Sequence, residues 1–459
     1  MHPRFARLRE RHASEVSEGR AAGLSERGVN FTFPSLSYLD EFLRAATDRY
    51  DQVSNPDGSC CLCVAENRLS FKAADGGASI QGWLHDPAHR RAVPENPWAH
   101  YDDFAGCAEF RDNLASFLSS HFTSIRIASA DVVVGTGAGA VLEMLFTSIA
   151  AAGDAVLVPA PYYAAFENDL SIRAGLFVVP VTTKAPHFAV TTAALDAAAA
   201  AAERDGRRVA AVLLTSPHNP TGVIYSAGAL REVNAWCAAR ERCHLVSDEI
   251  YALSVHSAAE GERFVSVAEV CEGALGDFVH VVYGMSKDFC SSGFRVGVLI
   301  TQNEALKRAL ATLGYFHGIS QLAQHALAPL LVDSEFLAAY FAANQRRLAR
   351  QLAVVRELAR SLPGASSTGG VNEAKAGLFC WLDLRRFLKS PTFEGERQLF
   401  AELARDCKVV LTPGKDCAAE EPGFFRCCFA ASSEAELREA FLRMKTHFLA
   451  ERESSIILT

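Results

Sequence analysis

Short apolar runs that alternate with helix-like stretches constrain the fold of this chain more than any other feature of its sequence. The runs are rich in β-branched and aromatic residues, which is typical of strands buried in a core. They cover residues 156–158, 176–181, 209–214, 244–247, 279–283 and 296–300, and helix-like stretches such as 193–204 and 230–240 lie between several of them. Because strands joined through helices pair in parallel, this order predicts an α/β fold with a large, doubly wound, mostly parallel sheet.

The size and charge of the chain argue against several classes of protein. Its 459 residues are enough for a large core and two domains. A formal net charge of -8, with no dense basic stripe, argues against a nucleic-acid partner. No run reaches the ~18 apolar residues of a membrane-spanning helix, so no membrane association is expected. The basic N-terminus lacks an apolar stretch, and Glu10, Glu15 and Glu18 argue against a transit peptide.

Cysteines are frequent but do not form a recognisable framework. The chain has 13 of them, scattered through predicted core runs, for example at Cys380 and Cys427. This distribution is typical of a reduced intracellular protein, so a cytoplasmic location is expected. Cys60, Cys61 and Cys63 include a C-x-x-C spacing, but no second pair and no nearby histidine completes four ligands. No metal site is therefore expected.

Three segments divide the chain. Residues 1–60 form a charged N-terminal arm, residues 61–330 a large domain that holds the predicted sheet, and residues 331–459 a smaller α+β domain. Residues 61–85 could also pack with the small domain. Helical periodicity over residues 334–362 leads into that domain. Its expected strands cover residues 377–384, 408–411 and 424–429.

One lysine is placed where an α/β sheet carries its chemistry. The apolar run 279–283 is followed at once by Ser286 and Lys287, so Lys287 is expected at the carboxyl end of a strand. A lysine there can form a Schiff base with an aldehyde, while Ser286 and Arg295 offer a hydroxyl and a guanidinium to a phosphate. An aldehyde with a phosphate indicates pyridoxal 5'-phosphate. The alternative is an ordinary solvated Lys-Asp turn, and the other strand ends must decide between the two.

Two further strand ends carry polar groups suited to a pyridine ring. The run 209–214 leads to Asn219, and the run 244–247 leads to Asp248 and Tyr251. Asp248 can pair with the ring nitrogen and keep it protonated, and Asn219 and Tyr251 can hydrogen-bond the phenolic oxygen of the ring. Each residue alone is compatible with a structural turn. Because the ends of adjacent parallel strands meet at one edge, their joint occurrence predicts one cofactor site.

A glycine-rich turn separates a strand and a helix at residues 131–150. Gly135 to Ala140 match the pattern G-x-G-x-x-A, which is found in dinucleotide sites. No acidic residue ends the next strand, at 155–158, as a dinucleotide site would require. The same turn can direct backbone N–H groups and a helix N-terminus at a single phosphate, and this interpretation is favoured.

The ordered motifs resemble a known superfamily over about residues 60–450. Pro161–Tyr163, Asn219–Gly222, Asp248–Tyr251, Ser286–Lys287 and Gly293–Arg295 resemble the fold type I pyridoxal phosphate enzymes, which are aspartate aminotransferase-like. The stretches VAENRLSF, PAPYYAAFENDL, SKDFCSSGFRVG, GLFCWLDL and EPGFFRCCFA are similar to the 1-aminocyclopropane-1-carboxylate (ACC) synthase branch and its ACC synthase-like relatives.

The resemblance implies a role for each site residue. Lys287 would be the Schiff-base lysine and general base, and the other catalytic residues would be Asp248, Tyr251 and Tyr163, with Tyr163 stacked on the pyridine ring. The remaining cofactor contacts would come from Ala138, Gly139, Asn219, Ser286, Arg295 and Phe104. Substrate would be bound by Arg426, Glu66 and Asn219. Arg426 lies in an apolar strand-like run, where an unpaired guanidinium needs an anion, and the resemblance makes that anion the α-carboxylate of an amino acid.

The activity implied is ACC synthase-like: conversion of S-adenosylmethionine to ACC and methylthioadenosine. The alternatives are an amino-acid aminotransferase or another elimination on the same fold, and a protein that binds the cofactor without catalysis. A homodimer with shared active sites is also implied, because in the family the loop containing Phe104 reaches the neighbour's cofactor. ACC synthases have tyrosine where this chain has Phe104. A hydrogen bond is lost by this change, so ACC is not certain to be the main product.

Overall fold

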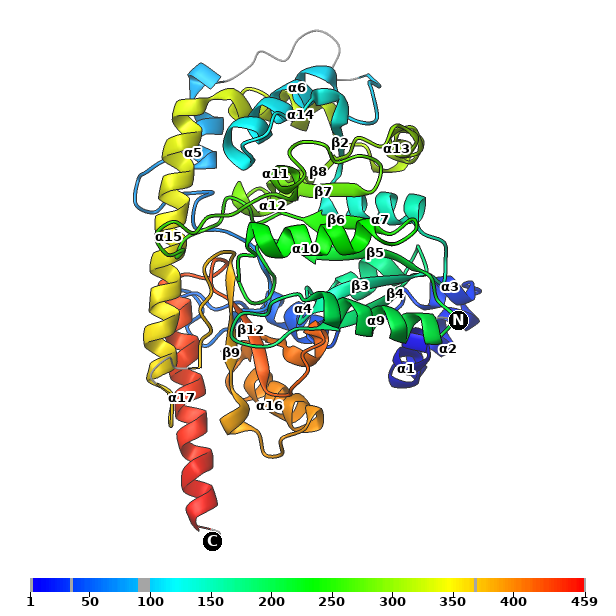
Figure 1. Cartoon of the computed structure of the whole chain (residues 1–459). Helices are drawn as coiled ribbons and strands as arrows, with labels where there is room; N and C mark the ends of the chain where they lie inside the picture. The colour runs from blue at the N-terminus through cyan, green and yellow to red at the C-terminus, as the bar shows by residue number, and fades with distance from the viewer. Residues whose placement is uncertain (1–2, 34–35, 90–99, 367–369, 458–459) are drawn as a thin grey trace.

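The computed structural model describes residues 3–33, 36–89, 100–366 and 370–457, and its centre is a seven-stranded sheet (Figure 1). The strands are β2 (Val132–Thr136), β3 (Ala155–Ala160), β4 (Phe177–Thr182), β5 (Val209–Thr215), β6 (His244–Asp248), β7 (Val279–Gly284) and β8 (Val296–Ile300). Their order is β2-β8-β7-β6-β5-β3-β4. Strand β8 is antiparallel to both of its neighbours, and the other neighbouring pairs are parallel. The predicted mostly parallel sheet is confirmed.

Helices cover both faces of this sheet (Figure 1). Several begin where a short polar side chain caps the first turn: Thr191, Ser226 and Asn303 each accept a hydrogen bond from a backbone N–H three residues on. The helices and short turns of this domain are α5 (Ile80–His85), η1 (Pro87–His89), α6 (Ala108–Phe117), η2 (Leu118–Phe122), η3 (Ser129–Asp131), α7 (Ala138–Ile149), α8 (Phe166–Ser171), α9 (Thr192–Arg204), α10 (Ala227–Ala238), α11 (Val267–Val270), α12 (Met285–Asp288), η4 (Ser292–Phe294), α13 (Glu304–His317), α14 (Gln321–Leu327) and η5 (Leu330–Val332).

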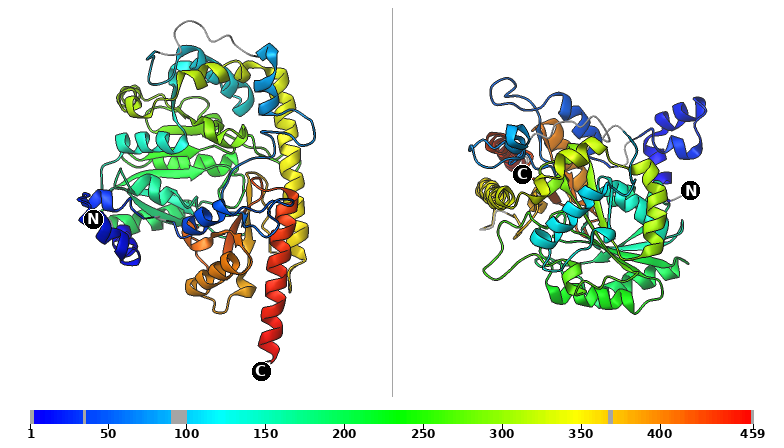
Figure 2. Two further views of the ribbon diagram at one scale, coloured as in Figure 1. Left: turned by 180° about the vertical axis from the view of Figure 1, so that it is seen from behind. Right: turned by 90° about the horizontal axis from the view of Figure 1, so that it is seen from above.

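A second, smaller domain follows the long helix α15 (Ser334–Arg360), which runs along the side of the molecule (Figure 2). Its antiparallel sheet has the order β11-β12-β9. The elements are β9 (Phe379–Asp383), η6 (Arg385–Phe387), α16 (Phe393–Arg405), β10 (Val409–Val410), β11 (Thr412–Pro413), η7 (Gly414–Cys417), β12 (Phe424–Cys428) and α17 (Glu434–Ile457). Strand β1 (Cys60–Cys61) pairs in parallel with β10, so residues 60–65 belong to the core of this domain.

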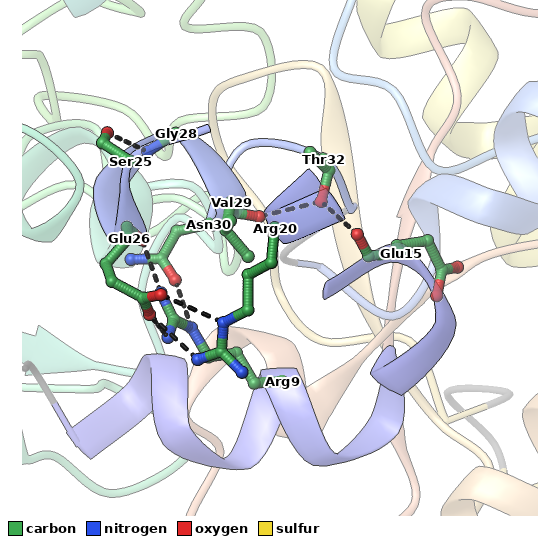
Figure 3. A network of polar contacts seen from close by, with 9 residues as sticks. All are labelled: Arg9, Glu15, Arg20, Ser25, Glu26, Gly28, Val29, Asn30 and Thr32. Atoms are coloured by element: carbon green, nitrogen blue, oxygen red, sulfur yellow. Dashed lines mark hydrogen bonds and ion pairs between the residues drawn. The ribbon is translucent and has the colours of Figure 1, made fainter. Parts of the chain in front are cut away.

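The N-terminal arm packs in two places. Helices α1 (Pro3–Arg11), α2 (Ala13–Ala21) and α3 (Glu26–Val29) enclose a small apolar cluster that contacts Ile172, next to α8. Within it the buried Arg9 donates to Asn30 Oδ1 at 2.7 Å and pairs with Glu26, which Arg20 also contacts at 3.0 Å (Figure 3). Helix α4 (Leu39–Thr47) instead packs against β1 and β10 in the small domain. The arm therefore contacts both domains.

Among the residues that the structure describes, no single helix is long and apolar enough to cross a bilayer. Two consecutive segments, Gln321–Val332 and Ser334–Arg360, are together long and apolar enough for a membrane span, and they meet at an angle of 88°.

Candidate active site

The carboxyl ends of β5, β6 and β7 bring three of the predicted residues together. Thr215 at the end of β5 pairs with Asp248, and Asp248 pairs with Val282 of β7, so the segments that follow these strands leave the sheet side by side. Asn219 Nδ2 donates to the hydroxyl of Tyr251 at 3.3 Å. Both side chains are buried. The amide and the phenol are therefore placed to share one acceptor, as the sequence predicts for the oxygen of a pyridine ring.

Asp248 is a buried carboxylate with an unused oxygen. Its side chain is 6% exposed, and Oδ1 has no hydrogen-bond partner among the residues described. Burial raises the pKa of this carboxyl to about 7. An unsatisfied buried acceptor is costly unless a donor approaches it. The N–H of a protonated pyridine is such a donor, and the Asp248 side chain fits that role.

Lys287 lies on the short helix α12 directly after β7. Its Nζ donates a hydrogen bond to the backbone carbonyl of Ala65. Burial, with the nearby charge of Arg426 as a second cause, lowers the pKa of this lysine to about 8. A substantial fraction of the amine is therefore neutral near physiological pH, and a neutral amine is the form that attacks an aldehyde or accepts a proton.

The glycine-rich turn forms an open anion cradle. Gly137 has φ 91°, and a Cβ at this position would lie 2.3 Å from Nη2 of Arg295, so the turn packs directly on the guanidinium. At the start of α7, a Cβ on Gly139 would have no neighbour within 4 Å. Arg295 donates to the carbonyls of Ser292 (2.8 Å) and Thr136 (3.4 Å), and within the described ranges it forms no ion pair with a carboxylate. A cation, a helix N-terminus and free space together suit a phosphate.

Ser286, the second predicted phosphate contact, is 6% exposed on the first turn of α12. Within the described part of the chain, no hydrogen bond joins the Ser286 hydroxyl or Ala138 to Gly137, Gly139 or Arg295. Their assignment to the phosphate stays a prediction that the resemblance implies.

Arg426 is a buried cation whose contacts are all neutral. It lies in β12 and is 1% exposed. Its guanidinium donates to Asn219 Oδ1 (3.1 Å), to the carbonyl of Cys63 (2.8 Å) and to Thr412 Oγ1 (3.3 Å). Its Nε has no partner among the described residues. A buried charge without a counter-charge is expensive, so this position is suited to a carboxylate brought by a ligand.

Tyr163 and Glu66 complete the predicted set. Burial raises the pKa of the Tyr163 phenol to about 12, with the charges of Arg426 and Asp248 close enough to act on it. The Tyr163 ring stands edge-on to Phe166, with 5.3 Å between centroids. Glu66 accepts hydrogen bonds from Ser292 Oγ (2.8 Å) and Arg68 Nε (2.6 Å). Both residues thus lie near the Lys287–Arg426 region, Glu66 on its more exposed side.

The segment around Glu66 has a function that the sequence did not reveal. Its backbone carbonyls at Cys63 and Ala65 accept hydrogen bonds from Arg426 and Lys287, respectively. One short backbone segment therefore contacts both cations of the site. Asn67 Nδ2 donates to Asn344 Oδ1 on α15 at 2.9 Å and anchors the segment. Backbone acceptors do not depend on residue type, and the only signal was the break in the apolar run at Glu66 and Asn67.

Phe104 is the one predicted contact that lies apart from the others. Its ring packs edge-on against Tyr315 at 5.5 Å and borders a cavity of about 270 Å³. Large exposed side chains line the same cavity: Tyr101 is 90% exposed, Tyr315 64% and Phe316 73%. This aromatic patch adjoins the cradle, because Thr136 Oγ1 donates to the carbonyl of His317. Among the described residues Phe104 has no contact with Lys287, Asp248 or Arg295, and its assignment to a cofactor stays a prediction that the resemblance implies.

Known proteins match this chain along most of its length. A family model for aminotransferase class I and II matches residues 79–443. The 1-aminocyclopropane-1-carboxylate synthase 6 of Oryza sativa subsp. japonica is 33% identical over 440 residues, covering 92% of this chain and 78% of that protein. A probable aminotransferase of Arabidopsis thaliana is also 33% identical over 440 residues, covering 92% of this chain and 85% of its own.

Solved structures show the same fold. Aspartate aminotransferase from Thermus thermophilus with maleate superposes with a TM-score of 0.74 at 23% identity, and covers 92% of this chain and 99% of that one. An aminotransferase from Mycobacterium tuberculosis has a TM-score of 0.73 at 22% identity, with 93% and 99% covered. The expected aspartate aminotransferase-like, fold type I architecture is confirmed.

Proposed function

The chain belongs to the aminotransferase class I and II family, in its ACC synthase-like branch, and from this premise we propose that it binds pyridoxal 5'-phosphate and acts on an α-amino acid. The observation that carries the proposal is a pair of orphaned buried atoms. Among the described residues, Asp248 Oδ1 has no donor and Arg426 Nε has no acceptor, and the charges of both residues influence the pKa of Lys287. A protonated pyridine and a substrate carboxylate would satisfy them together.

The residues present fit the cofactor. Arg295, Ser286 and the N-terminus of α7 at Ala138 and Gly139 would hold its phosphate, Asp248 its ring nitrogen, and Asn219 and Tyr251 its phenolic oxygen. Tyr163 would cover one face of the ring. When bound, pyridoxal phosphate supplies the aldehyde that a substrate amine can react with and a sink for electrons from the substrate Cα.

Lys287 and Arg426 would then divide the work on the substrate. Arg426 fixes the α-carboxylate with its fork of N–H groups, which limits the directions in which the Cα–H bond can point. Lys287, whose pKa is about 8 because of burial, accepts the Cα proton in its neutral form. Asp248 would accept the N–H of the pyridine nitrogen, and its carboxylate would stabilise the protonated ring, which is the form that withdraws electrons.

We propose S-adenosylmethionine as the substrate and ACC and methylthioadenosine as products. After Lys287 takes the proton, a bond forms between Cα and Cγ while the Cγ–S bond breaks, and the sulfur leaves with the electron pair as a neutral thioether. The Glu66 carboxylate, 28% exposed beside the Lys287 region, offers negative charge to a sulfonium. The similarity to an ACC synthase over 92% of the chain supports this choice.

An amino-acid aminotransferase is the second candidate, because the chain is equally similar, at 33% over 440 residues, to a probable aminotransferase. The same residues would hold a common amino acid, and the products would be a keto acid and a new amino acid. In both cases a homodimer with shared sites is proposed, since the aromatic patch at Tyr101, Phe104 and Tyr315 is exposed and adjoins the cradle. A cytoplasmic location, without nucleic-acid or membrane partners, is part of the proposal.

A product assay tests the proposed reaction. Purified protein supplied with pyridoxal phosphate is incubated with S-adenosylmethionine, and separately with common amino acids and a keto acid, and ACC and new amino acids are quantified. ACC that is formed by the wild type and lost in Lys287→Ala supports the first candidate. New amino acids without ACC favour the aminotransferase. Absence of both products, with no visible absorption from bound cofactor, refutes the proposed function.

A further inference from the structure

Directly after Lys287 stands Asp288, a carboxylate with no exposed surface. Its Oδ2 accepts from the backbone N–H of Leu253 (3.0 Å) and from the hydroxyl of Tyr283 (3.1 Å), and its Oδ1 accepts from Ser254 Oγ (2.5 Å). Ser254 and Tyr283 are themselves 0% exposed. Three hydrogen bonds in a dry environment hold this carboxyl rigidly.

Two of the three donors to Asp288, Leu253 and Ser254, belong to the segment that follows Asp248 and Tyr251, and the third, Tyr283, lies on β7. Ser254 N–H donates to the carbonyl of Tyr251 at 3.0 Å, so Leu253, Ser254 and the ring-binding tyrosine share one tight turn. On the other side, Tyr340 of α15 donates its hydroxyl to the backbone carbonyl of Asp288 at 3.0 Å. The turn that carries Lys287 is thus tied both to the neighbouring strand end and to the interdomain helix.

We propose that Asp288 is a positioning residue: its buried carboxyl fixes the helical turn that carries Lys287 against the turn that follows Asp248 and Tyr251. Asp288 acts through geometry rather than through its charge. Asp288 is not among the charged groups with the largest influence on the pKa of Lys287, which are Arg426, Cys428, Glu66 and Asp248. This role rests on the proposed function, since it sets where the lysine amine stands relative to the ring-binding acid.

Two substitutions separate hydrogen bonding from charge. In Asp288→Asn the amide oxygen can still accept from Leu253 and Tyr283, while the NH₂ group can donate to Ser254 Oγ, whose hydroxyl can rotate. In Asp288→Ala all three hydrogen bonds are lost. Ser254→Ala and Tyr283→Phe each remove one donor and serve if the alanine variant does not fold. Glu396→Ala is the matched control, because Glu396 is 1% exposed and accepts two backbone N–H bonds in the small domain.

The measurement is the rate at which acetic anhydride acetylates Lys287 in the full-length protein without added cofactor, as a function of pH, followed by peptide mass spectrometry. The wild type, Asp288→Asn and Glu396→Ala are expected to share a midpoint near the pKa of about 8 of the buried lysine. In Asp288→Ala the turn relaxes and the amine gains solvent, so the midpoint should rise by about one pH unit or more toward the ~10.4 of a free lysine. Ser254→Ala and Tyr283→Phe should shift it in the same direction, by less.

Turnover provides the second readout. With cofactor and substrate, Asp288→Ala should lower kcat by about 10- to 100-fold with little change in KM, because a misplaced base slows proton transfer more than binding. A midpoint in Asp288→Ala that matches Glu396→Ala overturns the proposal. So does an Asp288→Asn variant that behaves like Asp288→Ala, because charge would then be the cause. If the wild type binds no pyridoxal phosphate, the proposed function fails, and the acetylation profiles still decide the role of Asp288.

Discussion

Replacing Arg426 by lysine tests whether this residue binds the substrate carboxylate. Arg426 is 1% exposed, and among the residues that the structure describes its guanidinium makes three hydrogen bonds to neutral oxygens and has no partner for the Nε–H. Lysine keeps the positive charge but presents a single nitrogen, so it cannot offer a parallel pair of N–H groups to a carboxylate. The change removes one charge-assisted hydrogen bond from the complex.

The magnitude follows from that single bond. A hydrogen bond to a charged group contributes about 1.5–3 kcal/mol, so kcat/KM should fall by about 10- to 150-fold in Arg426→Lys. Most of the fall should appear in KM, because the carboxylate is bound in both the ground state and the transition state. Steady-state kinetics with the competent amino acid measure both constants.

The control is Arg347→Lys. Arg347, on α15, also makes several hydrogen bonds and pairs with Asp75 through two nitrogens, but none of its partners, Asp75, Ser70 and Ala78, is a predicted site residue. It should lower thermal stability slightly and leave KM unchanged. If Arg426→Lys keeps the wild-type KM, or if both variants change KM equally, the substrate carboxylate is not bound at Arg426.

Three other perturbations have defined outcomes. Asp248→Asn should retain visible absorption from bound cofactor while kcat falls by about 100-fold or more, and normal turnover would remove Asp248 from the ring nitrogen. Phe104→Tyr should raise the yield of ACC from S-adenosylmethionine, because a hydroxyl regains a hydrogen bond at the partner's cofactor, and an unchanged yield would show that this departure is neutral. Burial holds the pKa of His280 at about 3, so the folded state binds fewer protons than the unfolded state between about pH 3 and 6.5. The free energy of unfolding should therefore fall by several kcal/mol as pH drops through that range. In denaturant titrations, the free energy of unfolding of His280→Asn should fall less over the same pH range than that of the wild type.

The sequence predicted the strand ends of the site well because they follow from two simple features, the apolar runs and the parallel pairing of the strands. Apolar runs located β5, β6 and β7, and parallel pairing implied that residues just beyond them would meet. The hydrogen bond between Asn219 and Tyr251 agrees with that reasoning. That these residues hold a cofactor stays a prediction.

Other parts could not be predicted from residue type. The carbonyls of Cys63 and Ala65 contact Arg426 and Lys287 through backbone atoms that every residue has. The Lys-Asp pair suggested a solvated turn as the alternative, whereas the structure buries Asp288 completely, and two of its three donors, Leu253 and Ser254, come from a distant segment. Such long-range contacts depend on how the two domains and their connecting helix pack.

The small domain shows the same limit. Residues 408–411 were expected as one strand, and the structure has β10 there, at Val409–Val410, paired with β1; a separate strand that was not expected, β11 (Thr412–Pro413), follows and pairs with β12. Local periodicity does not reveal that the chain changes partner at Leu411. This change of partner places Thr412 beside Arg426, where its hydroxyl accepts a hydrogen bond at 3.3 Å.

The most direct test of the central claim is to locate the covalent link between cofactor and protein. The wild type is loaded with pyridoxal phosphate, reduced with borohydride and digested, and the modified peptide is identified by mass spectrometry. Lys287 should carry the reduced cofactor, and Lys287→Ala should yield no specifically modified peptide. Modification of a different lysine at comparable stoichiometry, or none at all in the wild type, would contradict the assignment of this site.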